Sequence, residues 1–179
     1  MSLLPPLPGD DKRAEDILDE IHVIFTRTGC RMRYQKPRWR IDRHPGVKEE
    51  LPVAGVRPYV QRKKTYLGVF GGWKTIGEFI PETGRWRTDL MKNMDAGGAG
   101  SQDMAQDHEM LMTVVQAMLM VIAKHKAHLM MNQQNRDNPT WLLCISNEFG
   151  EYRMVGELSQ ITPKRIDFRT LSPKATVAQ

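Results

Sequence analysis

The segment RKKTYLGVFGGWKTIGEF, residues 62–79, joins two β-rich runs through consecutive glycines. The first run ends in YLGVF and the second begins with WKTIGEF, and both are rich in aromatic and β-branched residues. Gly71 and Gly72 permit the positive φ angles of a two-residue turn, so the pattern predicts a β-hairpin centred there. A second turn at residues 81–84 and the RWRTDL run after it extend the prediction to a three-stranded meander over residues 65–90.

The residues around this meander carry a strong excess of positive charge. Between residues 27 and 92 there are sixteen Lys or Arg and six Asp or Glu, a balance of +10 in a chain whose net charge is +5. Aromatic residues from Tyr34 to Trp86 are interspersed among these cations. Single-stranded nucleic acid is held by cations that neutralise phosphates and by flat rings that stack on bases. The region therefore predicts a surface for a polyanionic partner.

We place the candidate nucleic-acid-binding residues on the strands of this region. The candidate cations are Arg31, Arg33, Lys36, Arg38, Arg40, Arg43, Arg57, Arg62, Lys63, Lys64, Lys74, Arg85 and Arg87. The candidate aromatics are Tyr34, Trp39, Tyr59, Tyr66, Trp73 and Trp86. Strand alternation puts the Arg residues that flank a ring on the opposite face, which predicts more phosphate contact than base stacking. The adjacent pair Lys63 and Lys64 breaks the alternation and predicts a bulge or a loop edge.

Two segments show helical periodicity. Residues 10–27 have an acidic start and one apolar stripe, which predicts an amphipathic helix. Residues 103–132 hold seven of the twelve methionines and are apolar on more than one side. We predict one long helix here that crosses the sheet with one face and contacts a second copy of the chain with another, giving a homo-oligomer. A simple central core helix is the alternative.

The residues after 139 return to a strand pattern. TWLLCIS at residues 140–146 predicts a buried strand, EYRMVGEL at 151–158 its hairpin partner, and KRIDFRTL at 164–171 a last strand. The predicted fold class is α+β, with a mostly antiparallel sheet of about seven to eight strands and two helices. We expect one domain over residues 10–171, a flexible arm at 1–9, a flexible loop at 93–103 and a disordered tail at 172–179.

Motifs and composition exclude several other classes of protein. No apolar run is long enough to span a membrane, and Cys30 and Cys144 without a CxxC motif predict reduced thiols in the cytoplasm. No nucleotide-binding, hydrolase or zinc-protease motif occurs, so we predict no catalytic residue, no metal and no cofactor. His125 and His128 have helical spacing for a metal pair but lack a third ligand at a compatible position.

The leading hypothesis is a non-enzymatic protein that binds single-stranded nucleic acid, with DNA favoured over RNA. It would act as an accessory factor in replication or transcription, with a polymerase or another protein as a further partner. The second hypothesis is a structural subunit of a virion or another assembly, whose basic surface meets acidic protein or packaged nucleic acid. The third is a metal-dependent nuclease that uses Asp42 and His44, and a cleavage assay separates it from the others.

Overall fold

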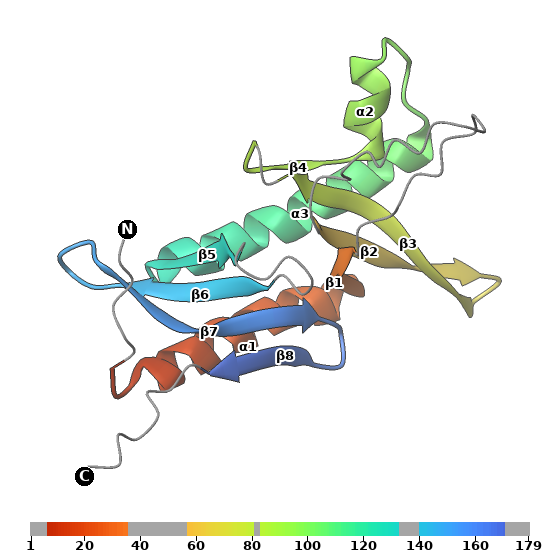
Figure 1. The fold of residues 1–179 in the computed structure, drawn as a ribbon. Coiled ribbons are helices and arrows are strands. Elements are labelled where there is room, and N and C mark those ends of the chain that lie inside the picture. Colours follow the sequence, from red (N-terminus) through yellow and green to blue (C-terminus); the bar gives the residue numbers. More distant parts are fainter. Residues whose placement is uncertain (1–6, 36–56, 81–82, 133–139, 171–179) are drawn as a thin grey trace, which may run out of the picture.

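The computed structural model describes residues 7–35, 57–80, 83–132 and 140–170, which form three helices and eight strands (Figure 1). In chain order the elements are α1 (Asp10–Thr28), β1 (Cys30–Gln35), β2 (Arg57–Tyr66), β3 (Val69–Ile80), β4 (Arg85–Arg87), α2 (Asp89–Asp95), α3 (Gln102–Lys124), β5 (Ala127–Met131), β6 (Trp141–Ser146), β7 (Tyr152–Ile161) and β8 (Ile166–Thr170). The predicted α+β class and antiparallel sheet are confirmed, and the short helix α2 is additional to the two predicted helices.

One arrangement occurs twice along the chain: a helix followed by an antiparallel four-stranded meander (Figure 1). Strands β1 to β4 follow α1, strands β5 to β8 follow α3, and consecutive strands pair within each meander. The meanders join where Met32 of β1 pairs with Ile161 of β7. The resulting sheet has the order β4-β3-β2-β1-β7-β6-β5, with β8 also paired to β7.

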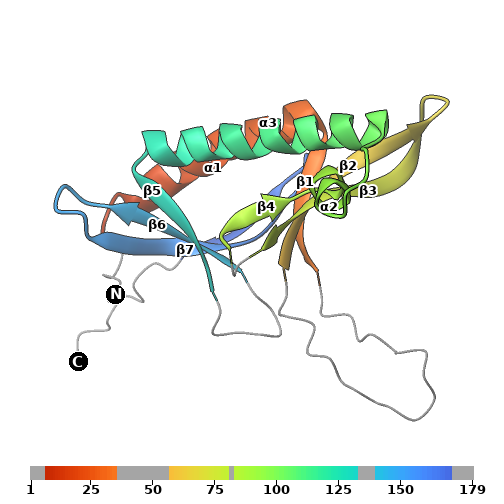
Figure 2. The same cartoon turned by 90° about the horizontal axis from the view of Figure 1, so that it is seen from above.

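Both long helices lie on the same side of the sheet (Figure 2). Helices α1 and α3 pack against each other, and their apolar stripes meet the strands in one buried cluster. The largest fully buried side chains include Phe25, Met32, Leu111, Leu143 and Leu158, which come from both meanders and both helices. No described helix covers the opposite side.

A buried ion pair ties the start of α1 to the second meander. Asp10 is 2% exposed, and its carboxylate accepts hydrogen bonds from Nε and Nη2 of Arg153 in β7, both at 2.9 Å. It also accepts from the backbone N–H of Leu7 at 2.8 Å. The bond from Arg153 outweighs the opposing effect of burial and holds the pKa of Asp10 below its ordinary value. The pair therefore stays charged and clamps helix to strand.

The turn between β2 and β3 lies at Leu67 and Gly68, so the prediction of a turn at Gly71 and Gly72 is wrong. Leu67 and Gly68 have φ angles of 51° and 77°, the positive values that a tight hairpin turn requires. The two later glycines lie within β3, next to a shift of the pairing register between Lys63 and Thr65. They accommodate this irregularity, whose place agrees with the break in alternation predicted at Lys63 and Lys64.

Helix α3 is shorter than the helix predicted over residues 103–132. It ends at Lys124, Lys126 adopts a φ of 51°, and the residues that follow form strand β5. The sequence AHLMM is compatible with the apolar repeat of a helix and with that of a strand. In the structure Ala127 is buried while His128 and Met130 are exposed, which is the alternation of a strand.

Helix α2 replaces the end of the predicted RWRTDL strand and the first residues of the predicted loop at 93–103. The side chain of Thr88 accepts a hydrogen bond from the backbone N–H of Met91 at 3.3 Å and caps the helix. The strand therefore ends at Arg87. The predicted tail at 172–179 and most of the predicted arm at 1–9 lie outside the described residues.

Candidate nucleic-acid interface

Part of the first meander presents polar side chains away from α1 and α3. Cys30 and Met32 of β1 are buried beneath the helices, so alternation turns Arg31 and Arg33 to the other side of the sheet. Residues that face each other in register share a side, which extends this surface across β2 and β3. We call this surface the basic face, and it consists of Arg31, Arg33, Tyr59, Gln61, Lys63, Trp73 and Thr75. Glu78, opposite Tyr59, shares this side, and its carboxylate pairs with Lys92 at 3.1 Å.

Arg31 is held in place at the centre of the basic face. The Cζ atom of its guanidinium lies 4.2 Å from the centroid of the Trp73 ring, a cation–π contact. Its Nε donates a hydrogen bond to Oε1 of Gln61 at 2.8 Å, and Nε2 of Gln61 donates to Oγ1 of Thr75 at 3.2 Å. One polar chain thus crosses three strands, and it orients a flat, charged group whose Nη atoms take no part in these bonds.

The basic face carries positive charge that the described carboxylates do not balance. Arg33 and Lys63 are exposed, and neither forms an ion pair within the described ranges. Partial burial, followed by the nearby Arg33, lowers the pKa of the Arg31 guanidinium, and Tyr59 opposes this. An arginine remains charged at neutral pH in spite of such a shift. Three cations therefore lie close together on one surface, where they favour a polyanion.

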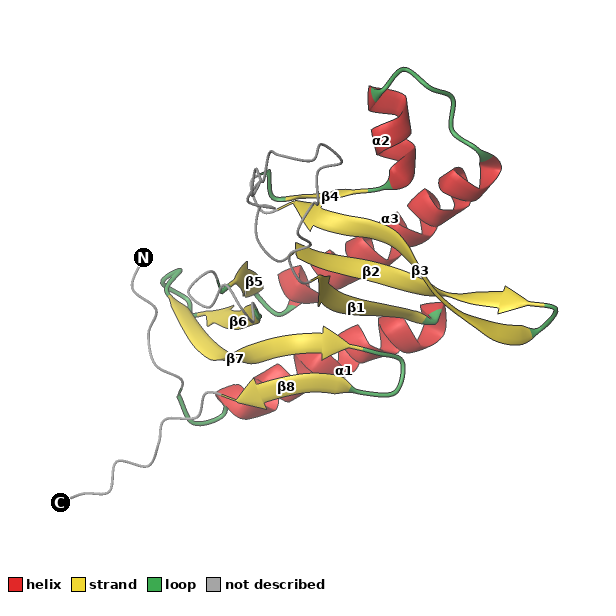
Figure 3. Cartoon of the chain, turned by 45° about the vertical axis from the view of Figure 1, so that its right-hand side comes forward, coloured by secondary structure: helices red, strands yellow, loops and turns green. Residues whose placement is uncertain are grey.

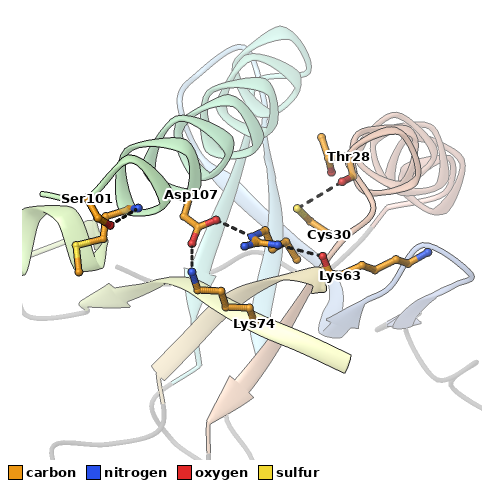
Figure 4. A network of polar contacts seen from close by, with 8 residues as sticks. Thr28, Cys30, Lys63, Lys74, Ser101 and Asp107 are labelled. Carbon is orange, nitrogen blue, oxygen red and sulfur yellow. Dashed lines mark hydrogen bonds and ion pairs between the residues drawn. The ribbon is translucent and has the colours of Figure 1, made fainter. Parts of the chain in front are cut away.

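Two predicted binding cations, Arg62 and Lys74, reach Asp107 on the helix side of the sheet, and Figure 4 labels Lys74 and Asp107. Arg62 Nε and Lys74 Nζ donate to the two oxygens of Asp107 in α3, at 2.6 and 2.5 Å. Asp107 is buried, so these two cations neutralise a charge inside the protein and fasten α3 to β2 and β3. The charges of Arg62 and Lys74 are thus already engaged with Asp107, and their assignment to a binding surface stays a prediction.

Two predicted aromatics, Tyr34 and Trp86, pack with the core. The Tyr34 hydroxyl donates to the carbonyl of Leu158 at 3.1 Å, and burial raises the pKa of this phenol. Trp86 is half-buried, with its ring centroid 5.5 Å from that of Phe79. Both rings are engaged in these contacts, and their assignment to base stacking stays a prediction. Alternation explains the result, because the neighbouring arginines occupy the outer side.

The other predicted cations have varied surroundings. Arg57 begins β2 on the same side as Tyr59, and Lys64 is exposed at the base of the β2–β3 turn region. Arg85 is exposed on β4, and Arg87 forms an ion pair with Asp95 at 3.2 Å. The remaining predicted site residues lie outside the described ranges: Lys36, Arg38, Trp39, Arg40 and Arg43, together with Asp42 and His44 of the nuclease hypothesis.

The second meander differs from the first in its charge. Arg169 of β8 pairs with Glu157 of β7 at 2.9 Å, and Arg165, just before β8, pairs with Asp167 of β8 at 3.1 Å. These two cations are matched by carboxylates of the same meander. Among the described residues, the cluster of unmatched cations therefore lies on β1 and β2.

An apolar cavity of about 630 Å³ lies between α3 and the ends of the two meanders. Phe79 of β3 and Trp141 of β6 meet there with ring centroids 5.2 Å apart. The buried Nε1 of Trp141 has no hydrogen-bond partner among the described residues. The rest of the wall is mostly apolar, with Leu119 and Ile122 from α3, and its polar members are Lys126, His128 and Ser146.

The histidines and cysteines have structural surroundings. His125 bonds to Glu20, and His128 packs its ring on Tyr152 with centroids 4.7 Å apart, so they lie on different elements and face different partners. Over the described ranges, His, Cys, Asp and Glu side chains form no group of three or more that could hold a metal ion. Cys30 and Cys144 are both buried, and burial raises the pKa of each thiol.

Gln61 and Thr75 were not among the predicted site residues, although alternation from Lys63 and Trp73 points to both.

Among the described helices, none has the length and apolar character needed to cross a bilayer. Comparisons with protein-family models, curated proteins and solved structures gave no match for this chain. The chain is an α+β protein, and among its described residues the distinguishing surface is a positively charged part of an antiparallel sheet that no described helix covers.

Proposed function

We propose that the protein binds single-stranded nucleic acid along the basic face, with DNA favoured over RNA, and that it does so without catalysis. The observation that carries the proposal is the arrangement of Arg31, Arg33 and Lys63, which are close together without carboxylate partners in the described residues. Arg31 and Arg33 are two residues apart on one strand, so their backbones are about 7 Å apart, and successive phosphates can meet successive cations.

The rings and planes of this surface favour a single strand over a duplex. Trp73 already holds Arg31 on its face, so the guanidinium offers its outer plane to an unpaired base. Duplex DNA keeps its base planes inside the stack and is read through its grooves, usually by an inserted helix or ribbon. A sheet surface with one stacked guanidinium and one half-buried Tyr59 suits exposed bases better.

The proposal predicts binding that weakens steeply with salt. Three phosphate contacts on a single strand give a slope of about −2 in a plot of log affinity against log salt concentration. Fluorescence anisotropy of a labelled oligonucleotide measures this slope, and unlabelled duplex serves as the competitor that tests strand type. Affinity that does not change between low and high salt, or an absence of binding, would contradict the proposal.

We further propose that the protein self-associates through the outer side of α3. Leu119 and Met120 are 59% and 73% exposed there, next to the mouth of the apolar cavity. Burying these two side chains in a contact between copies is favourable by the hydrophobic effect. Light scattering after size-exclusion chromatography is expected to show an oligomer that the double substitution Leu119→Glu and Met120→Glu converts to a monomer. A monomeric wild type would refute this contact.

A further inference from the structure

The hairpin of β2 and β3 extends beyond the rest of the sheet (Figure 3). Pairing between β1 and β2 stops at Cys30 and Arg62, and pairing between β3 and β4 involves only residues from Glu78 onward. Residues 63–73 therefore pair only with one another, as a two-stranded ribbon with both edges free of described strands. A ribbon of this kind is narrow enough to reach into a nucleic-acid structure.

The tip of this ribbon is apolar and exposed. Tyr66 and Leu67 are 77% and 89% exposed, and Val69 and Phe70 are also exposed. Leu67 moreover has a φ of 51°, a backbone conformation that costs free energy for leucine and that asparagine or glycine adopts more readily. Folding gains nothing from a large apolar side chain at this position, because no described residue covers it. Contact with a partner would account for a leucine at this exposed position.

The surroundings of the tip indicate which partner. Lys63 and Lys64 are exposed at the base of the ribbon, so the apolar tip rises from a positive collar. On the side of the basic face, Phe70 meets Trp73 with ring centroids 5.8 Å apart, and Trp73 in turn lies beneath Arg31. Aromatic and cationic groups thus lead from the tip to the basic face without interruption. This continuity favours nucleic acid as the partner. Binding to a lipid surface would require only the apolar tip and the lysines at its base.

We propose that the ribbon is a wedge for the junction between single-stranded and double-stranded DNA. Leu67 and Tyr66 rest against the last base pair of the duplex, while one separated strand follows Phe70 and Trp73 to Arg31. Apolar side chains inserted between base steps are a known means of unstacking DNA, and flanking lysines offset the repulsion between phosphates. The wedge consumes no nucleotide and stabilises only ends that open spontaneously, by binding the open state better than the closed one.

This inference rests on the proposed single-strand binding, and one assay separates the two. A forked duplex carries 2-aminopurine in its first base pair, and a single strand with the sequence of one fork strand serves as reference. Contact between apolar or aromatic side chains and one exposed base pair makes the wild type bind the fork about ten-fold more tightly than the reference strand, with a rise in 2-aminopurine fluorescence.

The test variant combines Leu67→Asn with Tyr66→Thr, the two residues that contact the last base pair. Asparagine suits the positive φ and threonine suits a strand, so the hairpin keeps its structure, which circular dichroism checks. We expect the variant to lose the preference for the fork and the fluorescence rise, with its affinity for the reference strand within about two-fold of wild type, because the basic face is unchanged. The matched control is Phe149→Asn, an equally polar change at an exposed apolar residue (82%) in the turn between β6 and β7, which retains the fork preference.

Equal affinity of the wild type for fork and reference strand, or a variant that keeps the preference, would overturn the wedge and leave single-strand binding standing. Failure to bind the reference strand would overturn both proposals. Vesicles of phosphatidylserine and phosphatidylcholine provide the remaining comparison. Vesicle binding that the hairpin variant abolishes, together with no fork preference in the wild type, would replace the wedge by attachment to a membrane.

Discussion

Replacing Arg31, Arg33 and Lys63 together by Gln is expected to reduce the affinity for single-stranded DNA severely and to flatten its salt dependence. Each cation that neutralises a phosphate contributes about 0.7 to the salt slope on a single strand, so the slope changes by about 2. That difference corresponds to about a 20-fold change in affinity over a four-fold rise in salt. Removal of Arg31 also deprives Trp73 of its stacked partner. Anisotropy titrations at several salt concentrations measure the effect.

The control for this variant removes the same charge from the far end of the molecule. Lys12 lies in the first turn of α1, and Lys124 and Lys126 lie at the end of α3, all exposed. Changing these three to Gln lowers the net charge equally but is expected to alter the affinity by less than about three-fold, since they lie away from the basic face. Equal losses in both triple variants would show that net charge, rather than the basic face, determines binding.

The substitution Asp10→Ala is expected to have the largest effect on stability. It leaves the Arg153 guanidinium, whose side chain is 12% exposed, without the carboxylate that accepts its two hydrogen bonds. Removal of one member of a buried ion pair lowers the free energy of unfolding by about 3–5 kcal/mol. Urea unfolding followed by circular dichroism measures the loss. The substitution Asp16→Ala on the same helix removes an exposed pair with Lys12 and should cost less than about 0.5 kcal/mol.

The same pair predicts a pH dependence of defined sign. The folded-state pKa of Asp10 lies below its ordinary value of 3.8, so its contribution to stability is fully present above that value. The contribution is lost as the pH falls through the folded-state pKa. Wild type should therefore lose stability in this acidic range more steeply than Asp10→Ala. Parallel curves for the two proteins would show that Asp10 does not titrate as the structure indicates.

Helix α1 and the β6–β7 hairpin could be predicted because their local patterns agree with their tertiary surroundings. The acidic start and single apolar stripe of residues 10–27 match a helix that buries Ile17 and Ile21, and the apolar TWLLCIS run matches a central strand. The errors occurred where one pattern fits two structures. Two consecutive glycines are compatible with a bulge as well as with a turn, and the sequence AHLMM is compatible with a strand as well as with a helix.

The site was predictable as an excess of charge but not as a surface. Composition shows that residues 27–92 are basic, yet the partner of Arg62 and Lys74 is Asp107, which no local pattern connects to them. Alternation along a regular strand would assign each residue to one side of the sheet. The register shifts in β2 and β3 break this alternation, so the side of a residue cannot be deduced from its position in the sequence. Only the three-dimensional arrangement separates cations that neutralise the protein's own charge from those left for a partner.

The way the two helices are shared has a consequence for the integrity of the chain. Helix α1 contacts β7 and β8 as well as its own β1, and α3 contacts β3 as well as its own β5. The helix of each half thus packs on strands of the other half. A fragment made by cutting within residues 96–101 would expose apolar surface that the other half covers in the intact chain. Each half therefore depends on the helix of the other to bury its strands.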